Sequence, residues 1–391
     1  MDKSNIKKEY RNAFAEIGKT DDEINARLGE IIEEFFFSED RVYHDFGDDM
    51  GYLEDTGNHD ARTEGMSYGM MMCVQLDMKE QFDRIWKWAK TYMYMDSGIH
   101  KGYFAWSCGL DGSKNAYGPA PDGEEYFAMA LFFASHRWGD GEGIFNYSRE
   151  AKEILRACIH NGENGEGAPM WNRENKQILF IPGSDFTDPS YHLPHFYRLF
   201  AEWAYEEDRE FFAQAARASY EYLAKACHPV SGMNSEYAEF DGSSYPYSKI
   251  AEWSADRHDW FYSDAYRTAA NIGLAYEWDG IDVGQRAAAE RLQYTLGVAN
   301  KDDPFVIYEV DGTRIEQPAL HPVGMLATTA QGALAVEGRI SLDSDDPTKR
   351  LAAEWVGRFW NEPLRKGDRR YYDNCLYIFA FLALSGKYKI W

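Results

Sequence analysis

The sequence predicts an all-α protein whose helices pair and close into one ring. Three observations support this fold class. Apolar residues recur with the helical period along almost the whole chain, the expected helices come in close pairs with short links such as 77–79 and 206–208, and no low-complexity linker interrupts the 391 residues. We therefore expect residues 1–391 to form a single catalytic domain, a toroid of about six helix hairpins.

The apolar pattern gives roughly twelve helices in chain order. Residues 6–36 hold one or two helices that end in a run of Ile and Phe, and 80–95 carries its Phe, Ile and Trp side chains on one side. Short strand-like patches at 178–181 and 305–308 predict loop hairpins. The remaining expected helices cover 64–77, 124–138, 148–161, 190–206, 209–227, 262–278, 284–297, 323–336, 347–361 and 371–385.

Long loops separate the helix pairs, at 97–123, 162–189, 228–261 and 298–322. In a ring of helices such loops gather at one end and build a cleft. The loops are rich in Gly, Asp, Tyr and Trp, and the chain as a whole is 16% aromatic, with 27 Tyr and 12 Trp. Aromatic rings match the apolar C–H faces of sugar rings, so the composition favours a carbohydrate ligand.

The net charge and the targeting features limit the classes of partner and the location that we expect for this protein. A net charge of −24 argues against nucleic acids, anionic membranes and polyanionic substrates, and favours a neutral substrate. No run of eighteen apolar residues occurs, and the first residues are charged, without an apolar signal region. Five scattered cysteines predict reduced, buried thiols. We expect a cytoplasmic monomer that meets imported substrate fragments.

The helix expected to start near Glu64 places an acidic residue at the mouth of an apolar segment. Thr63 is the expected N-cap, and the helix runs to Leu76. Gly65 and Gly69 lie four residues apart on one face, where another group could approach the backbone closely. The helix N-terminus lowers the pKa of Glu64, whereas a dry wall rich in Met raises it, so Glu64 is either an ordinary helix-start residue or a proton donor.

Two more acidic residues stand at predicted helix starts. Asp122 precedes a strongly apolar helix and could simply cap it, and Asp264 follows an aromatic loop, with Arg267 one turn later to neutralise it. Each residue alone has a plain structural role. Together with Glu64 they supply the carboxylates that glycoside hydrolysis needs, one protonated and one ionised on opposite sides of a sugar.

Other catalytic patterns are weak or absent. His192 and His195 are spaced like a metal-binding pair, but Pro194 lies between them and no third ligand stands at a suitable spacing. There is no glycine-rich phosphate loop with a following Lys and no Gly-x-Ser-x-Gly elbow. We therefore expect no metal and no cofactor.

The acidic motifs have a wider resemblance. Together with their flanks they resemble glycoside hydrolase family 8, and several longer segments resemble its subgroup of reducing-end xylose-releasing exo-oligoxylanases. The resemblance covers nearly the whole chain and implies an (α/α)6 barrel and an inverting reaction. The segments that carry it are 62–70, 121–123 and 263–267 for the family, and 102–108, 188–196, 320–324 and 369–374 for the subgroup.

The resemblance implies roles residue by residue. Glu64 is similar to the general acid, Asp264 to the general base, and Asp122 to the acid that binds and distorts the sugar in subsite −1. Tyr191 is similar to the residue that holds the water with the base. In an inverting enzyme the acid and base are expected roughly 6.5–9.5 Å apart, which leaves room for that water.

The same resemblance implies substrate contacts. Residues 320–322 match a loop that blocks the cleft past subsite +1, in which His321 recognises the terminal reducing sugar. The alternative is that these residues are an ordinary loop that ends in Pro before a helix. The tract 245–259 is longer and less regular than the resemblance predicts, which leaves the local cleft shape open. The implied substrate-binding residues are Arg62, Trp106, Arg267, Leu320, His321, Pro322 and Tyr372.

The predicted function is an inverting hydrolase that releases xylose from the reducing end of β-1,4-linked xylo-oligosaccharides of three or more units. One alternative is an endo-acting xylanase, glucanase or chitosanase of the same family, which the 320–322 loop and the missing signal region disfavour. The alternative from another class is a sugar epimerase or binding protein on a helical toroid. An epimerase would use paired His residues as acid and base, and few His residues are suitably placed.

Overall fold

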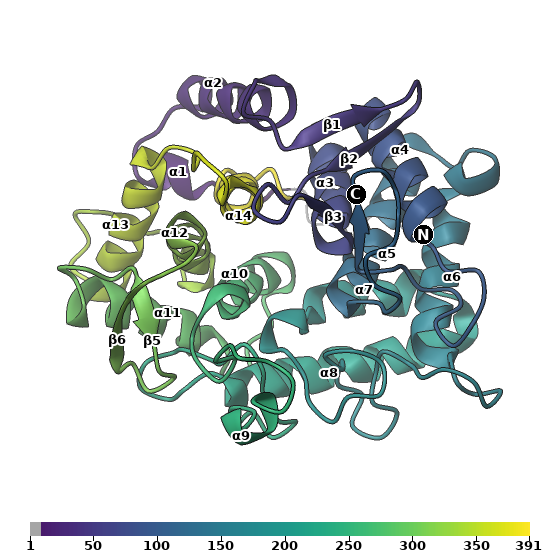
Figure 1. Cartoon of the computed structure of the whole chain (residues 1–391). Coiled ribbons are helices and arrows are strands. Elements are labelled where there is room, and N and C mark those ends of the chain that lie inside the picture. Colours follow the sequence, from purple (N-terminus) through teal and green to yellow (C-terminus); the bar gives the residue numbers. More distant parts are fainter. Residues whose placement is uncertain (1–8) are drawn as a thin grey trace.

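The fold is a closed double ring of helices, an (α/α)6 barrel (Figure 1). The computed structural model describes residues 9–391, so residues 6–8 of the first expected helix lie outside the described residues. Six helices form the inner ring: each contacts the next, and the last returns to the first. The inner helices are α3 (Thr63–Leu76), α5 (Pro121–Trp138), α7 (Pro194–Trp203), α10 (Arg267–Asp279), α12 (Pro322–Gln331) and α14 (Arg370–Leu384).

The outer helices cover this ring. Inner helices such as α3 and α14 are buried almost all round, whereas an outer helix such as α4 buries one face only. Single π-helical turns extend several outer helices at their C-terminal ends. The outer and short helices are α1 (Ala13–Glu16), α2 (Asp21–Ile32), α4 (Lys79–Trp88), α6 (Tyr147–His160), α8 (Arg209–Ala226), α9 (Tyr247–Ile250), α11 (Arg286–Tyr294) and α13 (Pro347–Asn361).

Three two-stranded antiparallel sheets occur in the described part of the chain. The strands β1 (Tyr43–Phe46) and β2 (Met50–Leu53) pair with each other, and β3 (Asp60–Arg62) pairs with β4 (Ser107–Gly109). The predicted hairpin at 305–308 is confirmed as β5 (Val306–Tyr308) with β6 (Arg314–Pro318). The hairpin predicted at 178–181 is wrong, because only a single bridge joins Ile178 to Trp171.

The expected close approach at the glycines is confirmed. A Cβ on Gly65 would lie 2.5 Å from the hydroxyl of Tyr371, and one on Gly69 would lie 2.4 Å from Leu53. Real side-chain atoms do not come so close, so α14 and β2 can pack against α3 only because both positions are glycine. The inner ring is therefore narrow directly behind Glu64.

The cap predicted at Thr63 is wrong, and the alternative of a capping role for Asp122 is excluded as well. Thr63 is the first residue inside α3, the N-cap is Arg62, and neither makes a side-chain capping bond. Asp122 is likewise inside α5, where Pro121 opens the helix after Ala120. The short strand β3 feeds directly into α3, so an extended backbone, not a capping side chain, defines that helix start.

Two further predictions concern cysteines and membranes. All five cysteines are buried and free, as expected. In residues 9–391 no helix has the length and apolar character required to cross a membrane.

Candidate active site

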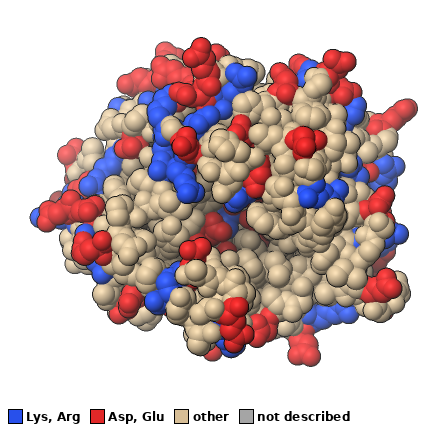
Figure 2. Space-filling model, in the orientation of Figure 1, with Lys and Arg blue, Asp and Glu red and all other residues tan. Residues whose placement is uncertain are grey.

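A cleft of about 480 Å³ opens at the end of the barrel where the inner helices begin. Figure 2 shows a hollow in this face with acidic side chains inside it. The predicted site residues that line the cleft come from four separate stretches of the chain, as expected for loops gathered at one rim. They are Arg62, Glu64, Asp264, Leu320, His321 and Tyr372.

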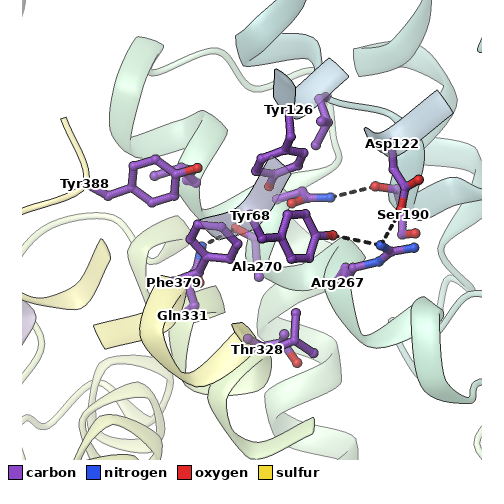
Figure 3. Close-up of a pocket in the computed structure, with 14 residues that line it drawn as sticks. Tyr68, Asp122, Tyr126, Ser190, Arg267, Ala270, Thr328, Gln331, Phe379 and Tyr388 are labelled. Atoms are coloured by element: carbon purple, nitrogen blue, oxygen red, sulfur yellow. Dashed lines mark hydrogen bonds and ion pairs between the residues drawn. The ribbon is translucent and has the colours of Figure 1, made fainter. Parts of the chain in front are cut away.

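Arg267, the first residue of α10, joins the three predicted carboxylates. Its Nη1 lies 3.0 Å from Glu64 Oε2 and 2.9 Å from Asp122 Oδ2, and it donates to the Tyr68 hydroxyl at 2.8 Å. Its Nη2 lies 3.3 Å from Asp264 Oδ2. Figure 3 shows Tyr68 and Asp122 pointing at this guanidinium. The sequence places these acids far apart, and one buried cation brings them together.

Glu64 sits in the first turn of α3, with Oε1 accepting a 3.0 Å hydrogen bond from the hydroxyl of Tyr371. Its position follows from β3, which pairs with β4, and from the 3.0 Å bond that the Thr63 amide donates to the Trp106 carbonyl. The pairing of β3 with β4 therefore fixes the first turn of α3 against the loop that carries Trp106.

The electrostatic surroundings of Glu64 favour its protonated form. Burial raises its pKa to about 8, Arg267 opposes that rise, and Asp264 and Asp122 add to it. A desolvated carboxyl near other carboxylates holds its proton at neutral pH. Of the two opposed influences on Glu64, burial is the larger, and this direction is the one that a proton donor requires.

Asp264 lies across the cleft in the 3-10 helix Ser263–Tyr266 that precedes α10. Its Oδ1 accepts a 2.9 Å hydrogen bond from the Tyr372 hydroxyl, and its side chain is 33% exposed, against 7% for Asp122. Because one rigid guanidinium contacts both Glu64 and Asp264, their facing oxygens lie within roughly 9 Å, which is compatible with the inverting separation. A water molecule can reach Asp264 from the cleft.

Asp122 is the deepest of the three predicted acids. Burial raises its pKa and Arg267 lowers it, while its Oδ1 accepts the amide of Gly123 at 2.9 Å. A Cβ on Gly123 would lie 2.5 Å from Thr63, so this glycine lets α5 approach the start of α3. The close approach brings Asp122 beneath Glu64.

Tyr191 lies behind the same cluster. It ends the 3-10 helix Pro189–Tyr191, its ring is 5.5 Å from the Arg267 guanidinium, and the Tyr197 hydroxyl donates to its carbonyl at 2.9 Å. Burial raises its pKa well above the ordinary value, so it stays a neutral phenol that can donate a hydrogen bond.

Leu320 and His321 form one wall of the cleft, and a buried network holds them. Nδ1 of His321 lies 2.8 Å from Oδ2 of Asp373, whose Oδ1 accepts the Gly324 amide at 2.7 Å. Arg365 contacts the same Asp373 and donates to the Leu320 carbonyl at 2.7 Å. Pro322 opens α12 directly after the wall. Because Asp373 takes Nδ1, the Nε2 edge of His321 is the one left for a ligand.

The predicted glycone platform pairs with a cation. The guanidinium of Arg62 lies 5.3 Å from the ring of Trp106, which is 38% exposed, and two carboxylates, Asp55 and Asp60, hold Arg62 at 3.1 and 3.0 Å. Trp106 is therefore a fixed, accessible ring at the cleft edge.

Some residues of the site escaped prediction. Tyr371 and Asp373 lie inside the segment 369–374 that carries part of the family resemblance. Nothing in their spacing distinguishes them from core positions of α14. Asp188 lies fully buried 3.8 Å from Arg267, and Glu236 and His258 come from the irregular loop before Asp264. No periodicity marks such loop residues, so only the folded chain assembles them.

His192 and His195 are buried in the barrel. His192 exchanges hydrogen bonds with Ser219 and Thr187, at 2.9 and 3.1 Å, and His195 packs its edge against Trp278. Burial lowers the pKa of both to about 3, so both rings are neutral. Across residues 9–391, no three His, Cys, Asp or Glu side chains are grouped so as to hold a metal ion.

A small cavity of about 20 Å³ lies on the barrel axis beneath Arg267 (Figure 3). Tyr68, Asp122 and Ser190 border it on the cleft side, and Gln331 borders it on the other. The space is enough for about one water molecule. It lies too deep and is too small to admit a sugar, so the substrate site is the open cleft above it.

A buried glutamate with a raised pKa and a more exposed aspartate, at one cleft of an (α/α)6 barrel, are the pair of carboxyl groups that a glycoside hydrolase requires. The comparisons with known proteins agree. The family model described as glycosyl hydrolases family 8 matches residues 44–345. The chain belongs to glycosyl hydrolase family 8.

Similar proteins share the whole length of the chain. It is 54% identical to a reducing end xylose-releasing exo-oligoxylanase of Halalkalibacterium halodurans, over 98% of this chain and 95% of the relative. It is 51% identical to the exo-oligoxylanase Rex8A of Paenibacillus barcinonensis, over 98% and 97%. A crystal structure of such an exo-oligoxylanase complexed with xylose, 53% identical, superposes with a TM-score of 0.90 over 98% of both chains.

Proposed function

We propose that this protein is a reducing-end xylose-releasing exo-oligoxylanase that cleaves β-1,4-linked xylo-oligosaccharides of three or more units with inversion. The observation that carries the proposal is the cleft itself: Glu64, whose pKa is raised, and Asp264 share one guanidinium, and residues 320–322 stand beside them as a wall. Relatives named as reducing-end xylose-releasing exo-oligoxylanases are 50–54% identical to this chain. No metal or cofactor takes part.

The reaction uses Glu64 and Asp264 in complementary states. Glu64 gives its proton to the glycosidic oxygen, and the bond from that oxygen to C1 of the sugar in subsite −1 breaks. Asp264 takes a proton from a water molecule, whose oxygen bonds to C1 from the opposite face. The β linkage therefore yields an α hemiacetal on the shortened chain, and xylose leaves from subsite +1.

The neighbouring residues position this chemistry. Asp122, the deepest acid of the cluster, binds the subsite −1 sugar as it distorts, and Tyr191 donates a hydrogen bond to the attacking water. Arg267 keeps the carboxylates at a fixed separation, and Tyr372 orients Asp264 from the other side. Because these groups are held before the substrate binds, little reorganisation is needed as charge develops.

The wall supplies the exo specificity. A chain that extends beyond subsite +1 would collide with residues 320–322, so only the terminal reducing xylose fits there. Nε2 of His321 is available to a hydroxyl of that sugar, because Asp373 occupies Nδ1. Trp106 stacks on the glycone side, with Arg62 fixed beside it.

The experiment compares xylotetraose with xylotetraitol, in which the reducing ring is opened by reduction. The enzyme should convert xylotetraose to xylose and xylotriose and leave xylotetraitol almost untouched, because the open alditol does not fill subsite +1. An endo-acting enzyme would release xylobiose from both compounds. A sugar epimerase or binding protein would form no new reducing ends from either.

The substrate class also bears on partners and location. The net charge of −24 suits a neutral oligosaccharide and disfavours nucleic acid and anionic membranes. We propose that the protein acts as a monomer in the cytoplasm on imported oligosaccharides. Sedimentation of the purified protein and fractionation of the cells that produce it test these two points.

A further inference from the structure

The buried Glu236 and the half-buried His258 form a pair directly behind Asp264, and the proposed mechanism uses neither of them. The backbone amide of Asp264 donates to Glu236 Oε1 at 3.1 Å. The other oxygen, Oε2, lies 2.7 Å from Nδ1 of His258. Both side chains border the cleft next to Asp264.

The backbone that Glu236 holds is strained. Ser263, the residue before Asp264, has a φ of 37°, a conformation that side-chain-bearing residues rarely adopt. Such a conformation persists only where the surroundings fix it, and it is found preferentially at functional sites. The hydrogen bond from Glu236 acts on the next amide in the chain and so restrains the strained segment.

The segment that carries Glu236 is itself fixed. Its amide donates to the Trp260 carbonyl at 3.2 Å, and the next amide, of Tyr237, donates to the His258 carbonyl at 2.9 Å. The ring of Tyr237 also stacks on His258, with centroids 4.3 Å apart. Residues 236–237 and 258–260 are therefore joined by backbone hydrogen bonds, and Glu236 projects from this joined segment.

Glu236 is not a second base. Its two oxygens are taken by the Asp264 amide and by His258, and its side chain is 6% exposed, against 33% for Asp264. Burial raises its pKa to about 7, and the hydrogen bond from His258 opposes that rise. The role that this geometry supports for Glu236 is to hold the backbone of Asp264.

We propose that Glu236, anchored by His258, is a positioning residue that fixes the Ser263–Asp264 peptide and so aims the Asp264 carboxylate at the attacking water. The inference rests on the proposed function, in which Asp264 is the base. A displacement of the base by about 1 Å can lower the rate of the chemical step about 100-fold without weakening substrate binding.

The test measures kcat and KM for Glu236→Ala, Glu236→Gln and His258→Ala on xylotriose and on β-xylobiosyl fluoride. Fluoride leaves with less help from an acid, but the attacking water still needs its base. Glu236→Ala should lower kcat about 10–100-fold on both substrates, with KM changed less than about threefold. Glu236→Gln keeps an oxygen for the Asp264 amide and should recover most of the rate.

Matched variants separate positioning from general damage. Glu239→Ala, three residues along, removes a surface pair with Lys249 at 3.1 Å and should leave kcat unchanged. Glu64→Gln should lose activity on xylotriose and regain much of it on the fluoride. If Glu236→Ala does not fold, His258→Ala carries the test, because it removes only the anchor and should lower kcat several-fold.

Three results would overturn the inference: an unchanged kcat in the folded Glu236 and His258 variants, a loss confined to KM, or recovery of Glu236→Ala on the fluoride. Each of them presupposes a wild-type enzyme that releases xylose from xylotriose. A wild type without that activity would contradict the proposed function instead, so the two failures are distinguishable.

Discussion

Oε2 of Glu64 lies 3.0 Å from Nη1 of Arg267, although 203 residues separate them in the chain. The contact opposes the largest influence on Glu64, since burial raises the pKa of the carboxyl and the guanidinium lowers it. Two further carboxylates on the same guanidinium share that attraction. The result is a glutamate that keeps its proton at neutral pH beside an aspartate that faces water.

Arg267→Met tests how far the cluster depends on this cation. The substitution leaves Glu64, Asp122 and Asp264 close together without a counter-charge, so we expect the free energy of unfolding at pH 7 to fall by about 3–5 kcal/mol. Urea denaturation of the variant measures this change. Arg267→Lys keeps the positive charge but not the planar guanidinium. Its free energy of unfolding should lie between those of the wild type and of Arg267→Met. A loss below about 1 kcal/mol for the Met variant would show that the cluster is not held by Arg267.

The pH dependence of kcat/KM reports the state of Glu64. A general acid is active only while protonated, so activity should be lost as the pH rises through the pKa of about 8. Initial rates on xylotriose between pH 5 and 10 measure this loss of activity on the alkaline side. Circular dichroism checks that the protein remains folded over the same range. A rate that stays level from pH 7 to pH 10 would exclude Glu64 as the proton donor.

Gly65→Ala tests the packing behind the acid. Its Cβ would lie 2.5 Å from the Tyr371 hydroxyl, which donates to Glu64 Oε1, so the tyrosine must move away. We expect a destabilisation of about 1–3 kcal/mol and a lower kcat. Gly29→Ala in α2 is the control: its Cβ meets nothing within 4 Å, and it should stabilise the helix by up to about 1 kcal/mol. Equal behaviour of the two variants would contradict the close approach at Gly65.

Helical periodicity was enough to predict the barrel. The inner helices are buried on all sides and give long apolar runs, such as α14, while amphipathic helices such as α4 form the outer layer. Helix ends were less predictable. Thr63 is a good capping residue by type, but the preceding strand β3 pairs with β4, and this tertiary pairing overrides the local preference.

The site was predictable only where chemistry marks the residue. Glu64, Asp122 and Asp264 stand at helix starts in the sequence, and the fold brings all three to Arg267. Glu236 lies in an irregular loop with no period or motif, so its bond to the Asp264 amide depends on the folded backbone. Local pattern indicates which residues are reactive, and only the fold determines what holds them.

Arg365→Met tests the wall at 320–322. The arginine donates to the Leu320 carbonyl and contacts Asp373, which in turn holds His321. Without it the wall should become mobile, and the share of xylobiose among the first products from xylohexaose should rise at least several-fold while total bond cleavage falls little. Arg358→Met, on the outer helix α13 and stacked on Trp355, is the control and should leave the products unchanged. Identical product ratios in both variants would mean that the wall does not need this support.

The most direct test of the account follows the wild-type reaction of xylotetraose labelled with ¹³C at its reducing-end C1, by NMR from the first minutes. The account predicts that all cleaved label appears in free xylose, and that the new end of the unlabelled xylotriose appears first as the α anomer. Label in xylobiose or xylotriose, or a new end that forms first as the β anomer, would contradict it.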